Sequence, residues 1–379
     1  MIADYVEQLK SALRDTVVGD YPWLDWFVGS TIDLLTSPFT GLRTRSYWPE
    51  LVCAVAIAAV VFLMRDRQPG QRFGAFLRYL FPRHVFIHQS AWVDCKLIIA
   101  NHFLMPMVDI TWRLAVPLLV GIFVGVLTSL FGAPPRLWLW STTTIIAFTI
   151  LWGLADDFGY YVFHYLSHRV PWLWAFHRVH HSAETLQVFA NVRVHPVELL
   201  LTGPFKNGFP ALVIAVAIYL GPGDAPFATI FGINLMAAFY GMVGSQLHHS
   251  HIWISWGRTL EHVLISPAMH HIHHSTDPKH WNRNMGGNFA LWDWMFGTLY
   301  VPRGREELTF GLGGQEKQPH PTLLAAYLEP FWQIMPFRDR ISRGLPTQVV
   351  RMVSGARQAM ARGDRSSVPS HASGREGAD

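Results

Sequence analysis

The sequence contains few charged residues and few cysteines. Asp, Glu, Lys and Arg make up only 15% of its 379 residues, whereas hydrophobic residues make up 50% and aromatic residues 14%. This fraction of charged residues is too low for an ordinary soluble domain of this length, so the composition indicates an integral membrane protein. Two cysteines, Cys53 and Cys95, supply neither a disulfide framework nor a CxxC metal site, and both are expected to be free thiols.

A dense basic stripe is also missing. The net charge is +4 and the pI is near 9.1, but Lys and Arg are scattered between apolar runs, which argues against nucleic-acid binding. These charges are typical of residues that flank membrane spans. Residues 1–20 lack the basic start, apolar stretch and small-residue cleavage site of a signal peptide, so no cleaved leader is expected.

Apolar runs predict an all-α, polytopic integral membrane protein with about five spans or partial spans. The runs are 51–64, which can be extended back to 47, then 114–131, 137–155, 209–220 with help from 199–204, and 225–243. The connections 132–136 and 221–224 are short and rich in Gly and Pro, so the last four runs are expected to form two membrane hairpins.

The chain divides into three expected regions. Residues 1–113 hold the first span and a basic connection, 114–337 hold the hairpins and a histidine-rich catalytic domain, and 338–379 form a basic, partly disordered cytoplasmic tail. By the positive-inside rule the basic connection faces the cytoplasm, which places the N-terminus outside and the segments after 155 and 243 inside. We therefore expect a protein of the inner, or cytoplasmic, membrane with a helical cap on the cytoplasmic side.

Histidine is concentrated in one part of the chain. Of 20 histidines, 15 lie between His164 and His280, where an even spread would place about six. They include one HxxxH and two HxxHH motifs, whose offsets of three and four put rings on one face of a helix. The motif histidines are His164 and His168, then His177, His180 and His181, and then His270, His273 and His274.

Neutral imidazole is a common ligand for iron, zinc, copper and nickel, so the three motifs predict a site for two cations. Two metals with open positions need roughly four or five donors each, which calls for ligands beyond these eight. His195 is one candidate. The other is one of His248, His249 and His251, of which we favour His249.

An acidic residue near the first motif is a candidate partner for a ligating ring. Asp157 precedes His164 by seven residues and shares its helix face, so it is expected to hold a ligand through the second ring nitrogen. Glu198 and Asp277 are weaker candidates for the same task.

Several motifs of other enzymes are absent. No ExxH is present, which argues against the soluble di-iron carboxylate bundles, and no HExxH is present, which disfavours a zinc hydrolase. The chain also has no GxGxxG after a strand, no HPGG and no cysteine set for an iron–sulfur cluster. It is therefore expected to take electrons from a separate protein.

The order of the histidine motifs resembles the fatty acid hydroxylase and sterol desaturase superfamily of membrane di-iron enzymes. The resemblance covers 151–302 and extends to ADDFGYYVFHYLSH, VPWLWAFHRVHHS, NVRVHPVELL and NRNMGGNFALWDWMFGTLYVP. It implies that the eight motif histidines bind two iron ions, with His195 and His249 as further ligands. It also implies a part in catalysis for Asp157 and His195, and aromatic packing by residues 292–298 under the metals.

The resemblance further implies a hydroxylase that uses dioxygen to oxidise an unactivated C–H bond of a lipid entering from the bilayer. The family acts on sterols, sphingoid bases, acyl chains, ether lipids and carotenoids, and a ferredoxin, cytochrome or reductase would donate the electrons. The alternatives are a lipid desaturase with the same ligands, a metal transporter or storage protein, and a zinc-stabilised scaffold. Zinc can also replace iron in a purified sample, because nitrogen sites generally favour it.

Overall fold

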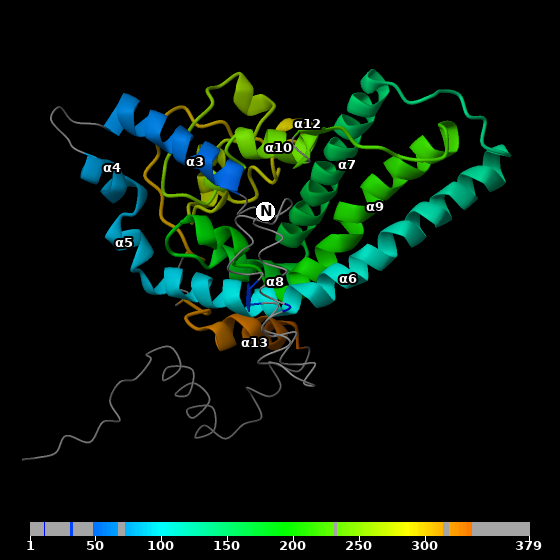
Figure 1. Cartoon of the computed structure of the whole chain (residues 1–379). Helices are drawn as coiled ribbons and strands as arrows, with labels where there is room; N and C mark the ends of the chain where they lie inside the picture. Colours follow the sequence, from blue (N-terminus) through cyan, green and yellow to red (C-terminus); the bar gives the residue numbers. More distant parts are fainter. Residues whose placement is uncertain are drawn as a thin grey trace, which may run out of the picture.

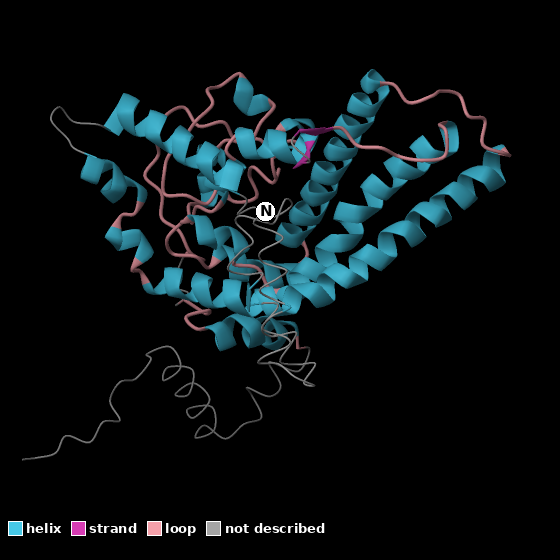
Figure 2. Ribbon diagram, viewed as in Figure 1, coloured by secondary structure: helices cyan, strands magenta, loops and turns pink. Residues whose placement is uncertain are grey.

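The computed structural model describes residues 11, 31–32, 48–66, 73–230, 233–313 and 318–335. Their regular secondary structure is helical apart from one pair of two-residue strands, which confirms the all-α class, and loops join the helices (Figures 1 and 2). The strands β1 (Thr229–Ile230) and β2 (Ile233–Asn234) are antiparallel. The expected tail at 338–379 lies outside the described residues.

Three long helices dominate the fold. They are α6 (Gln89–Phe131), α7 (Thr142–Arg169) and α9 (Pro196–Leu220). Segments of all three are long and apolar enough to cross a membrane, namely Ile110–Phe131, Thr142–Arg169 and Pro196–Leu220. Helix α9 packs against both α6 and α7 and lies between them in Figure 1.

Local sequence sets where these helices begin and end. Ser141 and Thr144 form a capping box at the start of α7, and Pro171 follows its end, where a proline disfavours continued helix. Close packing of α9 depends on glycine. A Cβ at Gly159 on α7 would collide with the backbone carbonyl of Phe205, and one at Gly203 on α9 would collide with Trp112.

Two details of the expected spans are wrong. The run 225–243 is not one helix, because it contains the β1–β2 pair and then only the short helix α10 (Leu235–Met242). Pro226 and the β-branched residues Thr229, Ile230 and Ile233 favour a break and extended backbone over a helix. The runs 114–131 and 137–155 also do not form a hairpin of two directly packed helices, because α9 lies between α6 and α7. Residues 137–141 are not helical and precede the start of α7.

The first apolar run forms a shorter helix than a full span. It comprises α3 (Trp48–Val61) and one π-turn, η2 (Phe62–Asp66), and is followed by α4 (Phe73–Leu80) and α5 (Arg83–Phe86). Helix α3 packs against α10. Cys53 and Cys95 are both free, as expected.

A cap of short elements sits at one end of the long helices (Figure 1). Its α-helices are α8 (Pro171–His181), α11 (Pro267–His273), α12 (Leu291–Phe296) and α13 (Leu323–Ile334). Its single turns of 3-10 helix are η3 (Val188–Val192), η4 (Ser245–Leu247), η5 (Leu260–His262) and η6 (Pro278–His280). Helix α13 packs on α8, so the cap joins segments that are far apart in the sequence.

Candidate metal centre

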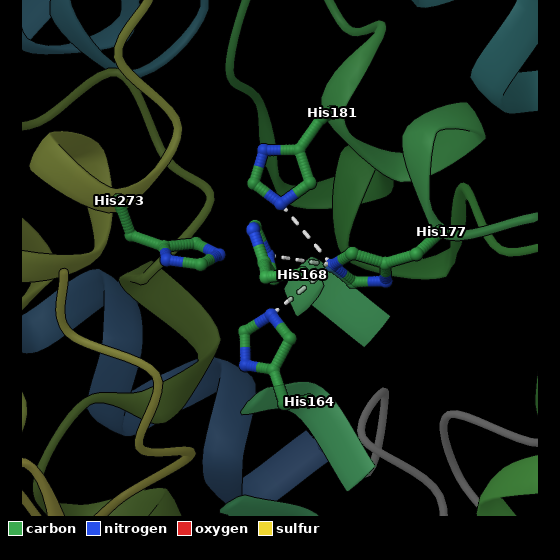
Figure 3. Close-up of side chains that lie close together, drawn as sticks. All are labelled: His164, His168, His177, His181 and His273. Carbon is green, nitrogen blue, oxygen red and sulfur yellow. Dashed lines mark hydrogen bonds between the residues drawn. The ribbon is translucent and has the colours of Figure 1, made fainter. Parts of the chain in front are cut away.

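Five histidines converge where α7, α8 and α11 meet, and we name them the five-histidine group (Figure 3). One ring nitrogen from each residue lies within 4.8 Å of the others. The members are His164 and His168 from α7, His177 and His181 from α8, and His273 from α11.

The spacing of these nitrogens fits a shared cation better than hydrogen bonds. The Nε2 atom of His177 lies 3.1 Å from the Nε2 atoms of three other rings, those of His164, His168 and His181. A ring nitrogen carries either one proton or one lone pair, so it cannot bond all three neighbours. Two nitrogens each about 2.1 Å from one cation, at right angles, would lie about 3.0 Å apart.

The ring of His273 gives independent support for a cation. Its Nε2 atom is buried and has no hydrogen-bond partner among the described residues, yet it faces the other four rings (Figure 3). An unpaired buried polar atom costs about 1–3 kcal/mol. A bound cation would remove that cost by accepting the nitrogen lone pair.

Four further histidines form a second set, the four-histidine group. They are His180 from α8, His249 after η4, and His270 and His274 from the α11 segment. The Nε2 atom of His249 lies 3.1 Å from that of His180, 3.0 Å from that of His270 and 3.2 Å from that of His274. The geometric argument for a shared cation therefore applies here too.

Each HxxHH motif contributes to both groups. In α8 the outer pair, His177 and His181, joins the five-histidine group while His180 joins the four-histidine group. In α11 the distribution is reversed, because only His273 joins the five-histidine group. The groups adjoin, since the rings of His181 and His274 stack with centroids 4.5 Å apart. One HxxHH helix turn can therefore hold two neighbouring metals.

Hydrogen bonds to the second ring nitrogen orient several of these rings. The Nδ1 atom lies 2.7 Å from the Met285 carbonyl oxygen in His164, 3.3 Å from that of Arg193 in His180, and 2.9 Å from that of Arg283 in His273. A carbonyl can only accept, so Nδ1 carries the proton and donates it. The Nε2 lone pair is then directed into the group, as a metal ligand requires.

Glu198 provides the corresponding contact for His177. Its carboxylate oxygen lies 2.6 Å from His177 Nδ1, and both side chains are buried. A carboxylate in this position increases the basicity of a ligating imidazole. Sequence reasoning named Glu198 only as a weaker candidate, because the contact depends on how α9 packs beside α8.

Burial keeps the rings of the cap neutral. It lowers the pKa of His180, His181, His270 and His274 well below the usual range, with neighbouring histidines adding to the effect. Burial also lowers the pKa of His273 to about 3. Their lone pairs are therefore available to a cation at neutral pH.

Asp157 occupies a different position from the one expected. Its carboxylate accepts hydrogen bonds from the backbone of Asn288 and Phe289, the side chain of Asn288, and the Trp292 indole, at 2.9–3.1 Å. It bonds no ligating ring among the described residues. Asp157 instead anchors the loop that carries the Met285 carbonyl, so it acts on His164 indirectly.

Asp293 fixes the same loop, whereas the sequence had indicated only a packing role for residues 292–298. It accepts hydrogen bonds from the backbone of Met285 at 2.7 Å and of Gly286 at 2.8 Å, and from the Thr298 hydroxyl. Burial raises its pKa to about 6. The WDW sequence could have indicated it, because an acid between two tryptophans in a buried segment needs donors nearby.

A buried ion pair holds the other side of the cap. Arg193 lies 2.7 Å from Asp94, and both side chains are fully buried. The Arg193 guanidinium also donates to the Val179 carbonyl and the Ser182 hydroxyl, at the end of α8. Arg193 thus fixes α8 with its side chain and orients His180 with its carbonyl.

The structure does not bring His195 into either group. Its Nδ1 atom accepts a hydrogen bond from the backbone of Val197 at the start of α9, and its Nε2 atom lies 3.1 Å from the Tyr327 carbonyl. It therefore caps a helix, and this position does not support the expected roles as ligand and catalytic residue. Asp277 likewise caps η6, and its carboxylate accepts a hydrogen bond from the backbone of Lys279. This position does not support the expected role as partner of a ligating ring.

The structure favours His249 over its two neighbours as the further ligand. His248 Nε2 lies 3.2 Å from the Ile265 carbonyl, and His251 Nε2 lies 2.7 Å from the Tyr79 carbonyl. Of the ten histidines expected as ligands, nine are therefore brought together in the two groups.

A pocket of about 370 Å³ opens onto the five-histidine group. His168, His181 and His273 form part of its wall, and Trp174 and Trp281 contribute aromatic surface. No member of the four-histidine group lines it. A molecule can thus approach one of the two groups through this pocket.

Comparisons with known proteins agree with this geometry. The chain is 29% identical over 193 residues to an ornithine lipid hydroxylase of Rhizobium tropici, covering 51% of this chain and 53% of that protein. It is 31% identical over 159 residues to an alkylglycerol monooxygenase of Xenopus tropicalis, covering 42% and 31%. It is 29% identical over 175 residues to a cholesterol 25-hydroxylase-like protein of Danio rerio, covering 43% and 63%.

These matches span about one third to two thirds of the relatives' own length. No solved structure matches the chain. The family model described as fatty acid hydroxylase matches residues 148–298, a range that contains every member of both histidine groups. Through this segment the chain is similar to the fatty acid hydroxylase family.

Proposed function

We propose that this protein is a membrane lipid hydroxylase that holds one iron ion in each histidine group. The observation that carries the proposal is the pair of adjoining groups built from nine buried or nearly buried histidines. The matched relatives support the lipid substrate, because their names describe hydroxylases or monooxygenases of an ornithine lipid, an alkylglycerol and cholesterol. Hydroxylation is therefore the proposed outcome in preference to desaturation.

Bound iron would supply the activation of dioxygen needed to oxidise an unactivated C–H bond. The protein contributes the neutral nitrogens that would hold both ions and the carbonyls that orient the rings. Glu198 holds a proton on His177 Nδ1 through its 2.6 Å contact, so the Nε2 lone pair stays directed into the five-histidine group. We assign the approach of substrate to the pocket at His168, His181 and His273.

Two further parts of the proposal concern partners and location. The sequence carries no motif for a redox cofactor other than the histidine groups, so a separate ferredoxin, cytochrome or reductase is proposed as electron donor. Three apolar helices long enough to cross a membrane support an integral membrane enzyme. We propose the inner membrane, with the cap on the cytoplasmic side.

Lipid mass spectrometry of cells supplied with isotopically labelled dioxygen tests this function. The wild type is compared with His180→Ala and His273→Ala, which each remove a ligand from one group. His262→Ala is the matched control, because His262 lies outside both groups and its ring bonds the Arg258 carbonyl. We expect a lipid that gains one labelled oxygen in the wild type and the control only.

The alternatives give different results in the same experiment. A lipid that has lost two hydrogens and gained no oxygen would identify a desaturase. Identical lipids in all four strains, with the electron donor co-expressed, would contradict the enzymatic proposal and favour a metal-binding role.

A further inference from the structure

A second and larger pocket, about 820 Å³ in volume, lies among η2, α4, α5 and two loops of the cap. None of its lining residues belongs to either histidine group. Five arginines line it, and no acidic residue is among the described residues of its wall. These arginines are Arg65, Arg78, Arg258, Arg303 and Arg305. We propose that this arginine pocket binds a phosphate group.

The charge of the arginine pocket is not balanced within the described structure. None of the five guanidinium groups forms an ion pair or hydrogen bond with another described residue. Five like charges around one cavity produce a positive potential that concentrates anions. The planar guanidinium presents donors that match the oxygens of phosphate, often two at a time.

Packing holds the arginine pocket in shape. The Tyr79 carbonyl on α4 lies 2.7 Å from His251 Nε2, which joins two walls of the pocket. Beneath them, Ile252 and Ile254 pack with Ala54 and Ala58 of α3 in one hydrophobic cluster. Two of the segments that supply arginines, α4 and the loop after His251, are therefore fixed relative to one another, as a binding site requires.

The elements around the arginine pocket expose apolar side chains. Met64 beside Arg65 is 78% exposed, and Phe73 on α4 is 72% exposed. Phe81, at the end of α4, is 60% exposed. Exposed apolar residues next to arginines are typical of a surface that lies at the headgroup level of a membrane. The ligand we infer is therefore the phosphodiester of a membrane lipid, and free phosphate shares its chemistry.

The test compares the full-length wild type with an Arg78→Gln/Arg303→Gln double variant. A Lys96→Gln/Arg136→Gln double variant is the matched control, because it also removes two exposed positive charges but from outside the pocket. Native mass spectrometry would measure retention of phosphatidylglycerol and of diacylglycerol with the same acyl chains. In parallel, the unfolding temperature would be measured in inorganic phosphate and in chloride at equal ionic strength.

We expect the wild type and the control to retain phosphatidylglycerol but not diacylglycerol. Hydrogen bonds to charged groups contribute roughly 1.5–3 kcal/mol, so the Arg78→Gln/Arg303→Gln variant should bind at least about tenfold more weakly. Stabilisation by inorganic phosphate that the double variant loses would identify a small anion as a ligand. If inorganic phosphate does not stabilise the wild type but phosphatidylglycerol is retained, the ligand is the lipid headgroup.

Equal phosphatidylglycerol retention by the wild type and the Arg78→Gln/Arg303→Gln variant, with no phosphate effect, would overturn the proposal. The proposal would also be overturned if the wild type retained diacylglycerol as well as it retains phosphatidylglycerol. If the double variant does not fold, the single Arg303→Gln variant replaces it, because Arg303 is exposed in a loop. Binding is measured without turnover, so failure here is distinct from failure of the proposed hydroxylation.

Discussion

Glu198 shows how one side chain can control a metal ligand without touching the metal. Within the described structure it is the acidic residue hydrogen-bonded to a ring of the five-histidine group. Its carboxylate fixes both the tautomer and the orientation of His177. Its contribution should therefore appear in metal affinity more than in folding.

We expect Glu198→Gln to lower iron affinity by about 10–100-fold while the protein stays folded. The amide keeps an acceptor for His177 Nδ1 but loses the negative charge. Iron content measured against free iron concentration would show the change. Glu184→Gln is the control, since Glu184 is exposed and its side chain lies in neither group; equal iron affinity in both variants would contradict the role of Glu198.

The buried rings also predict how the metal-free protein responds to acid. Burial lowers the pKa of His273 to about 3 in the folded state, against about 6.5 when unfolded. Between these values the unfolded state binds more protons, so stability is full above about pH 6.5 and falls as pH decreases. The unfolding temperature of the metal-free protein should therefore decrease steadily from pH 7 to pH 5. A constant value over this range would show that the rings are not buried and neutral.

The residues that could be predicted from sequence are those whose geometry is local. The eight motif histidines follow from offsets of three and four, which place rings together on any helix. Glu198 and Asp293 act through contacts set by tertiary packing, such as the Asp293 bond to the Met285 backbone. His195 was expected to be a ligand because two metals need more donors than the eight motif histidines supply, and the structure places it as the cap of α9.

At the scale of elements, the close contact of α7 and α9 positions Glu198 beside α8. It depends on Gly159, where a Cβ would collide with the Phe205 carbonyl, whereas a Cβ at Gly208 on α9 would meet nothing within 4 Å. We expect Gly159→Ala to destabilise the protein by about 1–3 kcal/mol through overpacking and to weaken iron binding. Gly208→Ala should be neutral or stabilising by up to about 1 kcal/mol. Thermal unfolding in one detergent compares them, and equal stability of the two variants would refute the close packing.

Hydropathy predicted the long helices but not their arrangement. The runs 114–131 and 209–220, the latter with help from 199–204, lie in α6 and α9, because a long apolar run has few structures other than a helix. The position of α9 between α6 and α7 depends on side-chain and glycine contacts that hydropathy does not describe. The run 225–243 has the required apolar content, yet the β1–β2 pair lies within it and only its later part is the helix α10.

At the scale of the whole molecule, the proposed topology places the α6–α7 connection outside the cytoplasm and the cap inside. Single cysteines at Leu139 and Thr259, both exposed, test this in a chain with Cys53 and Cys95 replaced by serine. A membrane-impermeant maleimide added to intact cells should label the Leu139→Cys variant and spare the Thr259→Cys variant. The reverse pattern would place the cap on the outer side and exclude a cytoplasmic electron donor.

The central claim is that the two histidine groups hold two iron ions, and anaerobic iron titration tests it most directly. The account predicts two iron ions per chain in the wild type, and one in His164→Ala or His249→Ala, which each change one group only. A wild type that binds a single iron ion, or variants that bind as much iron as the wild type, would contradict it.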